Sequence, residues 1–527
     1  MEFSGLDYFT LAAYLVVVLI FGSYFSRQQR SSMDYFLGGK NLPWWAVAFS
    51  IVAAETSTLT FISIPGLAYI SNLGFLQLAL GYVVGRAIIS FVLLPAYARG
   101  KLWTAYELLG NRFGTRLRSF TTLVFQFTRL LADGVRLFAT AIPLSIITGW
   151  NYPTSILVIG LVTILYTYFG GIKAIVWLDL LQMSIYFASA ILAGFMILQA
   201  LPEGWNSVVS AAAPGEKFRI FSLGFEGGLR EFFSINYTLI TGLLGGAFLS
   251  MASHGTDQLI VQKLFSCRNL KDSQKALITS GILVFIQFAV FLMVGVLLYA
   301  YYGGVAMRSD EIFPRFIVEG LPAGLSGLII AGIFAAAMST LSASLNALAS
   351  TSMNDLIKPR LAKDLSESKE LLYSRLITLL WGIVFIAGAM FFKDKENPVV
   401  ELGLGIASFT YGGMLGVFFL GILSKKAGEE DALVGIWTAI FFMTWVIGVQ
   451  GAILTVLTII NLLAAIWIFA RIRSSIHRIA MLGFGGPILL LILFVVPAQI
   501  AWPWYVLIGT IVTIAVANTV ASLGKSQ

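Results

Sequence analysis

Apolar segments about 20 residues long recur along nearly the whole chain, and this feature restricts the fold more than any other. A helix of that length crosses the hydrocarbon core of a bilayer. Hydrophobic residues fill 58% of the 527 positions and charged residues only 11%, which is unlike a soluble domain. Because backbone groups in lipid must satisfy one another, we predict an all-α polytopic membrane protein with roughly 13 to 15 transmembrane helices.

The distribution of basic residues predicts how the chain is oriented in the membrane. The first apolar segment, residues 6–25, follows acidic residues and precedes Arg27 and Arg30, the reverse of a cleavable signal. We therefore predict a retained helix with its N-terminus outside. The loops that this assignment puts inside hold most of the other basic residues, among them Arg99, Lys101, Arg112, Arg116, Arg118, Lys263, Arg268, Lys271, Lys275, Lys358, Arg360, Lys363, Lys425, Lys426, Arg471, Arg473 and Arg478. The alternation places the C-terminus inside, and it accounts for the formal charge of +8 without a nucleic-acid partner.

Few residues suit catalysis or metal binding. The single cysteine, Cys267, excludes an internal disulfide, and His254 and His477 are too far apart in the chain to indicate a metal cluster. The sequence holds no paired-histidine or cysteine-based constellation. We therefore predict a protein that is not an enzyme and needs no cofactor.

Two apolar segments carry polar residues and helix breakers at positions that would lie deep in a bilayer. One, residues 46–69, contains VAAETSTLTFISIPG, and the other, residues 233–258, contains TGLLGGAFLSMASHGTDQ. Four ordinary spans separate them and four more follow, the pattern of a five-plus-five inverted repeat whose first helices are broken around a binding site. Glycine and serine also allow close helix packing. Packing alone gives no reason for Glu55, so we favour a transporter.

The repeat pattern predicts five parts along the chain. They are an N-terminal accessory helix with a cytoplasmic loop (1–42), the first inverted repeat (43–200), an extracellular loop (201–232), the second inverted repeat (233–425) and C-terminal accessory helices (426–527). The helix count between 430 and 500 stays open.

Several motifs, in a consistent order, resemble those of the sodium/solute symporter family. They are DYFLGGKNLPWWAVAFSIVAAETSTLTFISIPG from Asp34, YTYFGGIKAIVWLDLLQ from Tyr166, GTDQLIVQK from Gly255, AGIFAAAMSTLSASLNALAS from Ala331 and WPWYVLIG from Trp502. The family includes sodium/glucose, sodium/iodide, sodium/proline and sodium/sialic acid cotransporters. The resemblance implies a LeuT-type core with accessory helices and uptake of a small organic solute driven by a sodium gradient.

Hydroxyl-bearing residues of the fourth motif suit a sodium site. One face of a helix would carry Ala336, Ser339, Thr340 and Ala343. A hard monovalent cation binds hydroxyls together with carbonyls that are released at a helix break. The resemblance implies five ligands: the carbonyls of Ala53, Thr56 and Ala336 and the hydroxyls of Ser339 and Thr340. The alternative is that the hydroxyls only bond carbonyls of their own helix.

A second sodium site occurs in some members of this family. The resemblance assigns it Asp179, Ser339, Ser342 and the residue at 343, which is alanine here. Because that alanine removes a ligand, we predict one sodium ion per transport cycle. Asp179 has a simpler alternative role, which is to pair with Lys173 or to cap a helix.

The solute cavity is expected beside the two breaks. The candidates are Glu55, Ser57, Thr58 and Thr60 on the first broken helix, Ser250 and Ser253 on the second, and Asp133 and Arg136 on the third core helix. Arg129, Asp133 and Arg136 are spaced to interact on one helix face. They form either a structural ion ladder or a clamp in which Arg136 binds a carboxylate. We therefore expect a carboxylate or an amino acid as the solute.

Two other functions stay open. A proton-coupled carrier would use Glu55 or Asp179 as its proton-accepting carboxylate. A membrane sensor without transport would need an output domain, and we expect none because the sequence ends with ASLGKSQ directly after a helix. The lack of a targeting presequence favours a bacterial plasma membrane. The expected partners are lipid, sodium and the solute, and the oligomeric state stays open.

Overall fold

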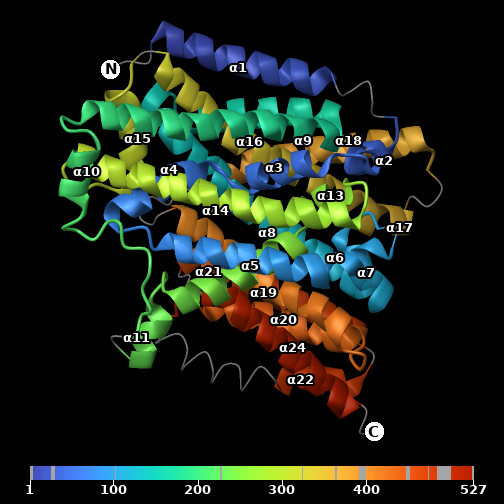
Figure 1. Ribbon diagram of the computed structural model, residues 1–527. Coiled ribbons are helices and arrows are strands. Elements are labelled where there is room, and N and C mark those ends of the chain that lie inside the picture. Colours follow the sequence, from blue (N-terminus) through green and yellow to red (C-terminus); the bar gives the residue numbers. More distant parts are fainter. Residues whose placement is uncertain are drawn as a thin grey trace. The chain divides into compact units, whose positions relative to one another are not determined.

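The computed structural model describes residues 4–24, 30–100, 102–225, 228–322, 324–361, 365–390, 399–446, 451–472, 474–483 and 500–524. Helices make up nearly all of this part of the chain (Figure 1), and one isolated β-bridge joins Leu42 to Cys267. The chain forms two compact units. Unit 1 consists of Met1–Leu76, Arg129–Ile220 and Gln262–Gly403, and unit 2 consists of Gln77–Thr128, Phe221–Val261 and Leu404–Gln527.

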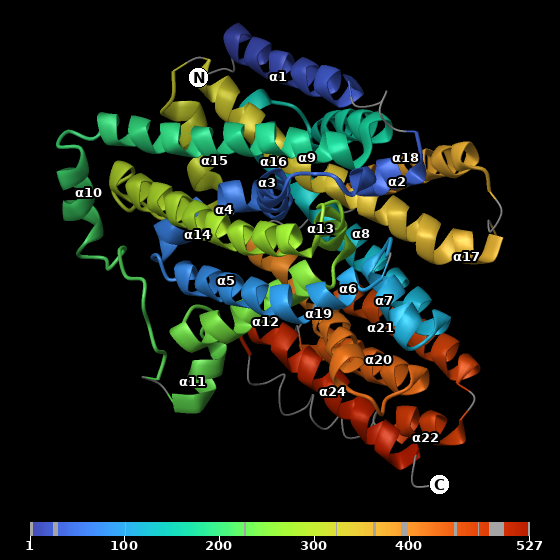
Figure 2. The same ribbon diagram turned by 45° about the vertical axis from the view of Figure 1, so that its right-hand side comes forward.

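Unit 1 is built from long helices and a few short ones. Its elements are α1 (Gly5–Tyr24), α2 (Ser32–Leu37), η2 (Gly38–Lys40), α3 (Trp44–Glu55), α4 (Thr58–Ile70), most of α8 (Thr115–Thr148), α9 (Tyr152–Ala200), α10 (Trp205–Ala212), α14 (Leu270–Tyr301), α15 (Ser309–Glu319), α16 (Leu325–Thr351), η4 (Ser352–Ile357), α17 (Lys358–Leu361) and α18 (Glu367–Ala389). Figures 1 and 2 both show α16, α9, α3 and α14 side by side, and these helices pack on one another in that order.

Helix α16 forms the core of unit 1. In the apolar stretch that starts with this helix, Leu325–Arg360, 94% of the most apolar window is buried, against 28% for α1. Small residues allow its neighbours to approach closely. A Cβ on Gly327, for example, would lie 2.7 Å from Asp7 Cα of α1. Because α16 is so deeply buried, its hydroxyl groups must find partners inside the protein.

The first of the two unusual segments is broken, as predicted. Helices α3 and α4 meet at an angle of 63°. Between them Thr56 (φ −81°, ψ 91°) and Ser57 (φ −84°, ψ 174°) are extended, so the i→i−4 pattern of hydrogen bonds stops there.

Unit 2 contains the second unusual segment. Its elements are α5 (Phe75–Val92), α6 (Leu94–Ala98), α7 (Ala105–Arg112), the start of α8, α11 (Gly228–Ser234), the π-turn η3 (Thr241–Gly245), α12 (Gly246–Gly255), most of α19 (Val399–Leu423), α20 (Glu429–Val446), α21 (Gly451–Arg471), α22 (Ser475–Gly483) and α24 (Trp504–Gly524). Helix α13 (Gln258–Phe265) has residues in both units.

The glycines of this second segment do not mark the break itself. They pack against α5 instead: a Cβ on Gly246 would lie 2.4 Å from Leu78 O, and one on Gly242 2.6 Å from the backbone carbon of Gln77. The helix is interrupted later, at Thr256 and Asp257, between α12 and α13. The discontinuity is therefore confirmed, while the glycine cluster serves close packing, the alternative that the composition left open.

Fewer helices than the predicted 13 to 15 pass as membrane spans by length and composition within the described residues. In the described part, seven helices are long and apolar enough to cross a membrane, or eight if α3 and α4 form one bent span. One reason is α9, whose 49 residues correspond to about 70 Å of helix, more than twice the thickness of a hydrocarbon core. Gly171 (φ 57°, ψ −162°) divides it. A further part of the expected apolar sequence, 484–499, lies outside the described residues.

The compact units do not follow the predicted repeats. Both 43–200 and 233–425 contribute residues to unit 1 and to unit 2. The five-part division of the chain therefore stays a prediction.

Candidate functional site

The break between α3 and α4 interrupts the hydrogen-bond pattern of the helix. Thr56 N–H donates to Val52 O, and Ser57 N–H donates to Glu55 O. Ser57, the N-cap of α4, makes no side-chain capping hydrogen bond in the described structure. Carbonyl oxygens at the last turn of α3 are therefore available to another partner.

Helix α16 supplies a hydroxyl at this break. Thr340 Oγ1 lies 3.1 Å from Ala54 O and 3.3 Å from Ala336 O, so its single proton is shared between a carbonyl of α3 and one of its own helix. The contact brings Thr340 and Ala336, two of the predicted sodium ligands, to the end of α3 that carries the other two carbonyls, Ala53 and Thr56. Sodium binding by these five residues stays a prediction.

The side chain of Thr56 is hydrogen-bonded to another helix, α14. Its hydroxyl exchanges hydrogen bonds with the Gln287 amide of α14 at 2.7 and 3.1 Å, and Tyr186 OH donates to Gln287 Oε1 at 2.9 Å. This buried network fixes the chain at the break through a side chain and leaves the Thr56 carbonyl for other use. The sequence analysis missed Gln287, because an isolated glutamine inside an apolar helix gives no sign of its partner.

A fully buried ion pair lies beside Ser339. Asp179 of α9 accepts hydrogen bonds from Ser339 Oγ at 2.6 Å, from Ser50 Oγ of α3, and from Lys263 Nζ at 2.6 Å. The side chains of Asp179 and Lys263 are both 0% exposed. Because the Ser339 hydroxyl donates its proton to Asp179, its lone pairs point elsewhere and are available to a cation.

Two predictions about these charges are wrong. Asp179 of α9 pairs with Lys263 of α13 and not with Lys173, which the alternative role had suggested. Lys263 was assigned to a cytoplasmic loop, but its ammonium group is buried against α3 and α9. Ser342, the other residue of the predicted second sodium site, donates to Ser339 O in its own helix at 3.0 Å.

A second charged cluster lies on α8, as the spacing predicts. Arg136 Nη1 lies 3.0 Å and Arg129 Nη1 3.6 Å from the same oxygen, Asp133 Oδ1. Asp133 is 0% exposed. In the described structure its second oxygen, Oδ2, and Arg136 Nε are buried and make no hydrogen bond. Asp133 Oδ2 and Arg136 Nε can therefore bond a further partner.

The other predicted cavity residues have mixed surroundings. Thr58 is buried and donates to Ile333 O of α16 at 3.2 Å, so it fixes α4 to α16. Ser57 and Thr60 are buried, and Glu55 is partly exposed. In unit 2, Ser250 donates to Tyr82 O and accepts from Arg86 Nε, and Ser253 bonds His254 Nδ1. Their roles toward a solute stay predictions.

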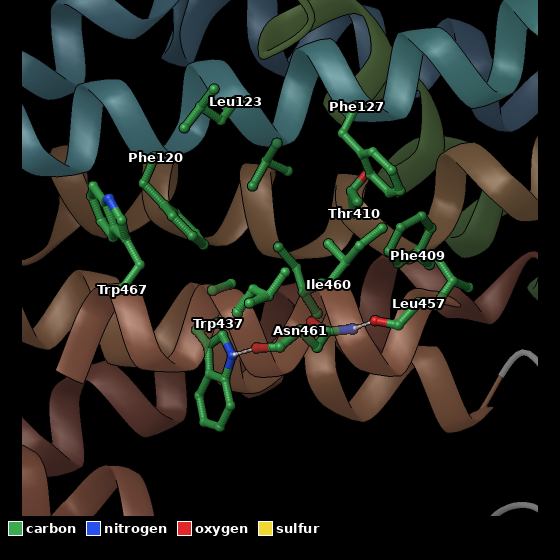
Figure 3. Close-up of a pocket in the computed structure, with 14 residues that line it drawn as sticks. Phe120, Leu123, Phe127, Phe409, Thr410, Trp437, Leu457, Ile460, Asn461 and Trp467 are labelled. Atoms are coloured by element: carbon green, nitrogen blue, oxygen red, sulfur yellow. Dashed lines mark hydrogen bonds between the residues drawn. The ribbon is translucent and has the colours of Figure 1, made fainter. Parts of the chain in front are cut away.

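A pocket in unit 2 has a different character (Figure 3). It has a volume of about 400 Å³ and is lined by aromatic and aliphatic side chains of α8, α19, α20 and α21, Phe120 and Trp467 among them. Its polar groups bond one another: Trp437 Nε1 donates to Asn461 O, and Asn461 Nδ2 donates to Leu457 O. None of the predicted site residues lines it. An apolar pocket with satisfied polar groups does not suit a charged solute.

Comparison with known proteins agrees with this arrangement. The model of the sodium:solute symporter family matches residues 35–439. The sodium/sialic acid symporter NanT of Aliivibrio fischeri is 30% identical over 455 residues, which are 84% of this chain and 88% of the relative. The sodium-coupled monocarboxylate transporter 2 of Mus musculus is 29% identical over 466 residues, covering 84% and 72% of the two chains.

A solved structure extends the likeness to the fold. It is the substrate-bound, outward-open state of a Na⁺-coupled sialic acid symporter, with a TM-score of 0.79 and 27% identity, and the match covers 99% of this chain and 98% of the other. The predicted helical symporter fold and sodium-coupled transport of a solute are thereby confirmed. The chain belongs to the sodium:solute symporter family.

Proposed function

We propose that this chain imports a small organic carboxylate together with sodium, and that the sodium ion binds where α3 breaks against α16. The observation that carries the proposal is the approach of Thr340 Oγ1 to Ala54 O and Ala336 O. A hydroxyl and two backbone carbonyls from two helices already converge there. Neutral oxygens of this kind replace the hydration shell of a hard monovalent cation.

Sodium at this position would connect the broken helix to α16. The ion then favours the conformation in which α3 and α16 lie together and the solute binds from outside. At the low sodium concentration inside, the ion leaves and the two helices are released, which lets the solute leave as well. The coupling is reciprocal, so sodium raises the affinity for the solute by the same factor as the solute raises the affinity for sodium.

The α8 cluster supports a carboxylate as the solute. Two arginines approach the same oxygen of Asp133, and Arg136 forms the shorter of the two ion pairs. Arg136 has a buried Nε without a hydrogen bond in the described part of the chain, and a guanidinium group binds carboxylates in two-point geometry. The named relatives carry sialic acid and monocarboxylates, both of which present a carboxylate group.

The buried ion pair argues against a proton carrier at Asp179. A proton on this carboxylate would leave the Lys263 ammonium without its counter-charge in a site that is 0% exposed. Glu55 remains the alternative proton acceptor. The chain is proposed to lie in a bacterial plasma membrane with its N-terminus outside and its C-terminus inside. The distribution of basic residues among the loops supports this orientation.

The test is uptake by the purified protein in liposomes at a fixed membrane potential. A panel of carboxylates, amino acids and neutral sugars is supplied with an inward gradient of sodium, of potassium or of protons. We expect uptake of a carboxylate that requires sodium. The variant Thr340→Ala should lose most sodium-driven uptake, whereas Thr351→Ala, a buried threonine of the same helix that bonds Ala347 O and Leu348 O, should keep it. Uptake that follows protons and ignores sodium would contradict the proposal.

A further inference from the structure

The ammonium group of Lys263 is held in the way that a monovalent cation is held. Three oxygens surround it: Asp179 Oδ2 at 2.6 Å, Ser50 Oγ at 2.7 Å and Ser50 O at 2.9 Å. The set contains a carboxylate, a hydroxyl and a backbone carbonyl, which are the ligand types that hard cations prefer. Both Ser50 and Lys263 are 0% exposed. The oxygens therefore form a closed cage with a single positive charge inside.

The cage is connected to both helices of the proposed sodium site. Ser50 belongs to α3, two turns before the break, and Asp179 belongs to α9 and also accepts a hydrogen bond from Ser339 of α16. Lys263 lies in α13, the helix that follows the second break. One buried charge thus joins the segment after the second break to the helix before the first.

We propose that Lys263 is a tethered cation that fills a latent sodium site at Asp179. The inference rests on the proposed function, because it concerns how many ions that function uses. The lysine neutralises the buried carboxylate permanently, so the cage takes up no ion and the transport cycle uses the single sodium at the α3 break. Removal of the ammonium group while the carboxylate stays would convert the cage into a sodium site.

The proposal follows from the cost of a buried charge. Asp179 without Lys263 is a carboxylate at a position with 0% exposure, and such a group requires a counter-charge. Alanine at 263 would empty the space of the lysine chain and leave the oxygens of Ser50 and Asp179 in place. A dehydrated sodium ion has the same charge as the ammonium group and fits an oxygen cage of this kind.

The experiment compares three variants with the wild type in detergent and in liposomes. Lys263→Ala opens the cage, Lys263→Ala with Asp179→Asn removes the demand for a cation, and Lys217→Ala is the matched control. Lys217 is also buried, but its ammonium group donates to the backbone carbonyls of Tyr69 and Ser71, so its removal exposes no carboxylate bonded to it in the described structure. Thermal unfolding is measured in sodium, potassium and choline, and uptake is measured against sodium concentration.

We expect Lys263→Ala to depend on sodium for its stability. Its melting temperature should rise by several degrees more in sodium than in potassium, beyond the difference seen in the wild type, because an ion that binds only the folded state stabilises it. The Hill coefficient for sodium should rise from about one in the wild type to about two in the variant. The double variant and Lys217→Ala should show neither change.

Two results would overturn the inference. One is a folded Lys263→Ala protein that sodium stabilises no better than potassium, or a Lys263→Ala protein that does not fold even in sodium. The other is a wild type that takes up two sodium ions per solute. A wild type that transports without any sodium dependence would instead overturn the proposed function, so the two failures are distinguishable.

Discussion

Unit 1 holds two buried clusters of charge, and they differ in how completely the protein satisfies them. At Asp179, one lysine and two serines bond the carboxylate, and the charges sum to zero. At Asp133, two arginines share one carboxylate oxygen, and neither the second oxygen nor Arg136 Nε has a hydrogen bond in the described structure. The first cluster is closed and the second is incomplete.

The difference separates two roles that sequence spacing cannot separate. A closed, neutral cluster holds helices together, and removal of one member leaves an uncompensated charge. An incomplete cluster can bind a ligand that supplies the missing hydrogen bonds. We therefore assign the Asp179 cluster to the coupling machinery and the Asp133 cluster to the solute.

The largest change in stability is expected when the lysine of the Asp179 cluster loses its charge. Lys263→Met keeps the volume of the side chain but removes its charge, so the variant should lose about 3 to 5 kcal/mol of stability. Lys263→Met combined with Asp179→Asn removes both charges and should regain most of that loss. Unfolding in detergent, followed by temperature or denaturant, measures both. If the single and the double variant were equally unstable, the pair would not act as an ion pair.

Removal of an arginine from the incomplete cluster should affect binding more than stability. Arg136→Gln should weaken the affinity for the carboxylate solute by about 10- to 100-fold, because a charge-assisted hydrogen bond contributes about 1.5 to 3 kcal/mol. Solute binding by calorimetry measures the affinity, and thermal unfolding should change little. Arg315→Gln is the control, since Arg315 is exposed and forms a surface ion pair with Glu319 of its own helix. Equal affinity in Arg136→Gln and the wild type would make the cluster a structural ladder.

Two serines of α16, Ser339 and Ser342, should differ in their effect on sodium binding. Ser339→Ala removes a hydrogen bond to Asp179 and a proposed sodium ligand, so the sodium concentration for half-maximal uptake should rise about 3- to 10-fold. Ser342→Ala removes a bond to Ser339 O of the same helix and a contact with Tyr166, neither of which involves a proposed ligand side chain, and it should leave that concentration unchanged. An effect of Ser342→Ala as large as that of Ser339→Ala would point to a second sodium ion bound there.

The smallest change in stability is expected at a largely buried pair of unit 2, His477 and Asp431. The hydrogen bond to the Asp431 carboxylate raises the pKa of His477 above its ordinary value. A raised pKa means that this pair stabilises the fold fully below the unfolded pKa of about 6.5, and that the stabilisation is lost as the pH rises through the folded pKa. The melting temperature of the wild type should therefore fall slightly from pH 6 to pH 8, by more than that of His477→Gln. Parallel pH profiles would exclude the pair as the cause.

Local sequence patterns predict the break between α3 and α4 and the hydroxyl-bearing helix α16 well. The polar run before Pro65 and Gly66 indicates the break, and the helical spacing of Ser339 and Thr340 places both on α16. These features depend on neighbours within a turn or two, where helical periodicity carries the information.

Contacts between distant segments are not predictable in this way. Lys263 and Asp179 are 84 positions apart, and Thr56 and Gln287 are 231 apart. The spacing of an isolated lysine does not distinguish a buried counter-ion from a basic residue in a cytoplasmic loop. The prediction for Lys263 was a loop residue, and the structure shows a buried counter-ion. The glycines near 242–246 show the same limit, because a close approach to α5 and a helix break call for the same residues.

A sodium titration of the purified protein, with potassium as the matched ion, tests most directly whether sodium binds between the α3 break and α16. It is carried out on the wild type, Thr340→Ala and Thr351→Ala. If the α3 break and α16 hold the coupling ion, sodium stabilises the wild type selectively and saturably, Thr340→Ala needs a higher sodium concentration for the same stabilisation, and Thr351→Ala behaves as the wild type. Equal stabilisation by sodium and potassium, or identical sodium curves for Thr340→Ala and the wild type, would contradict the account.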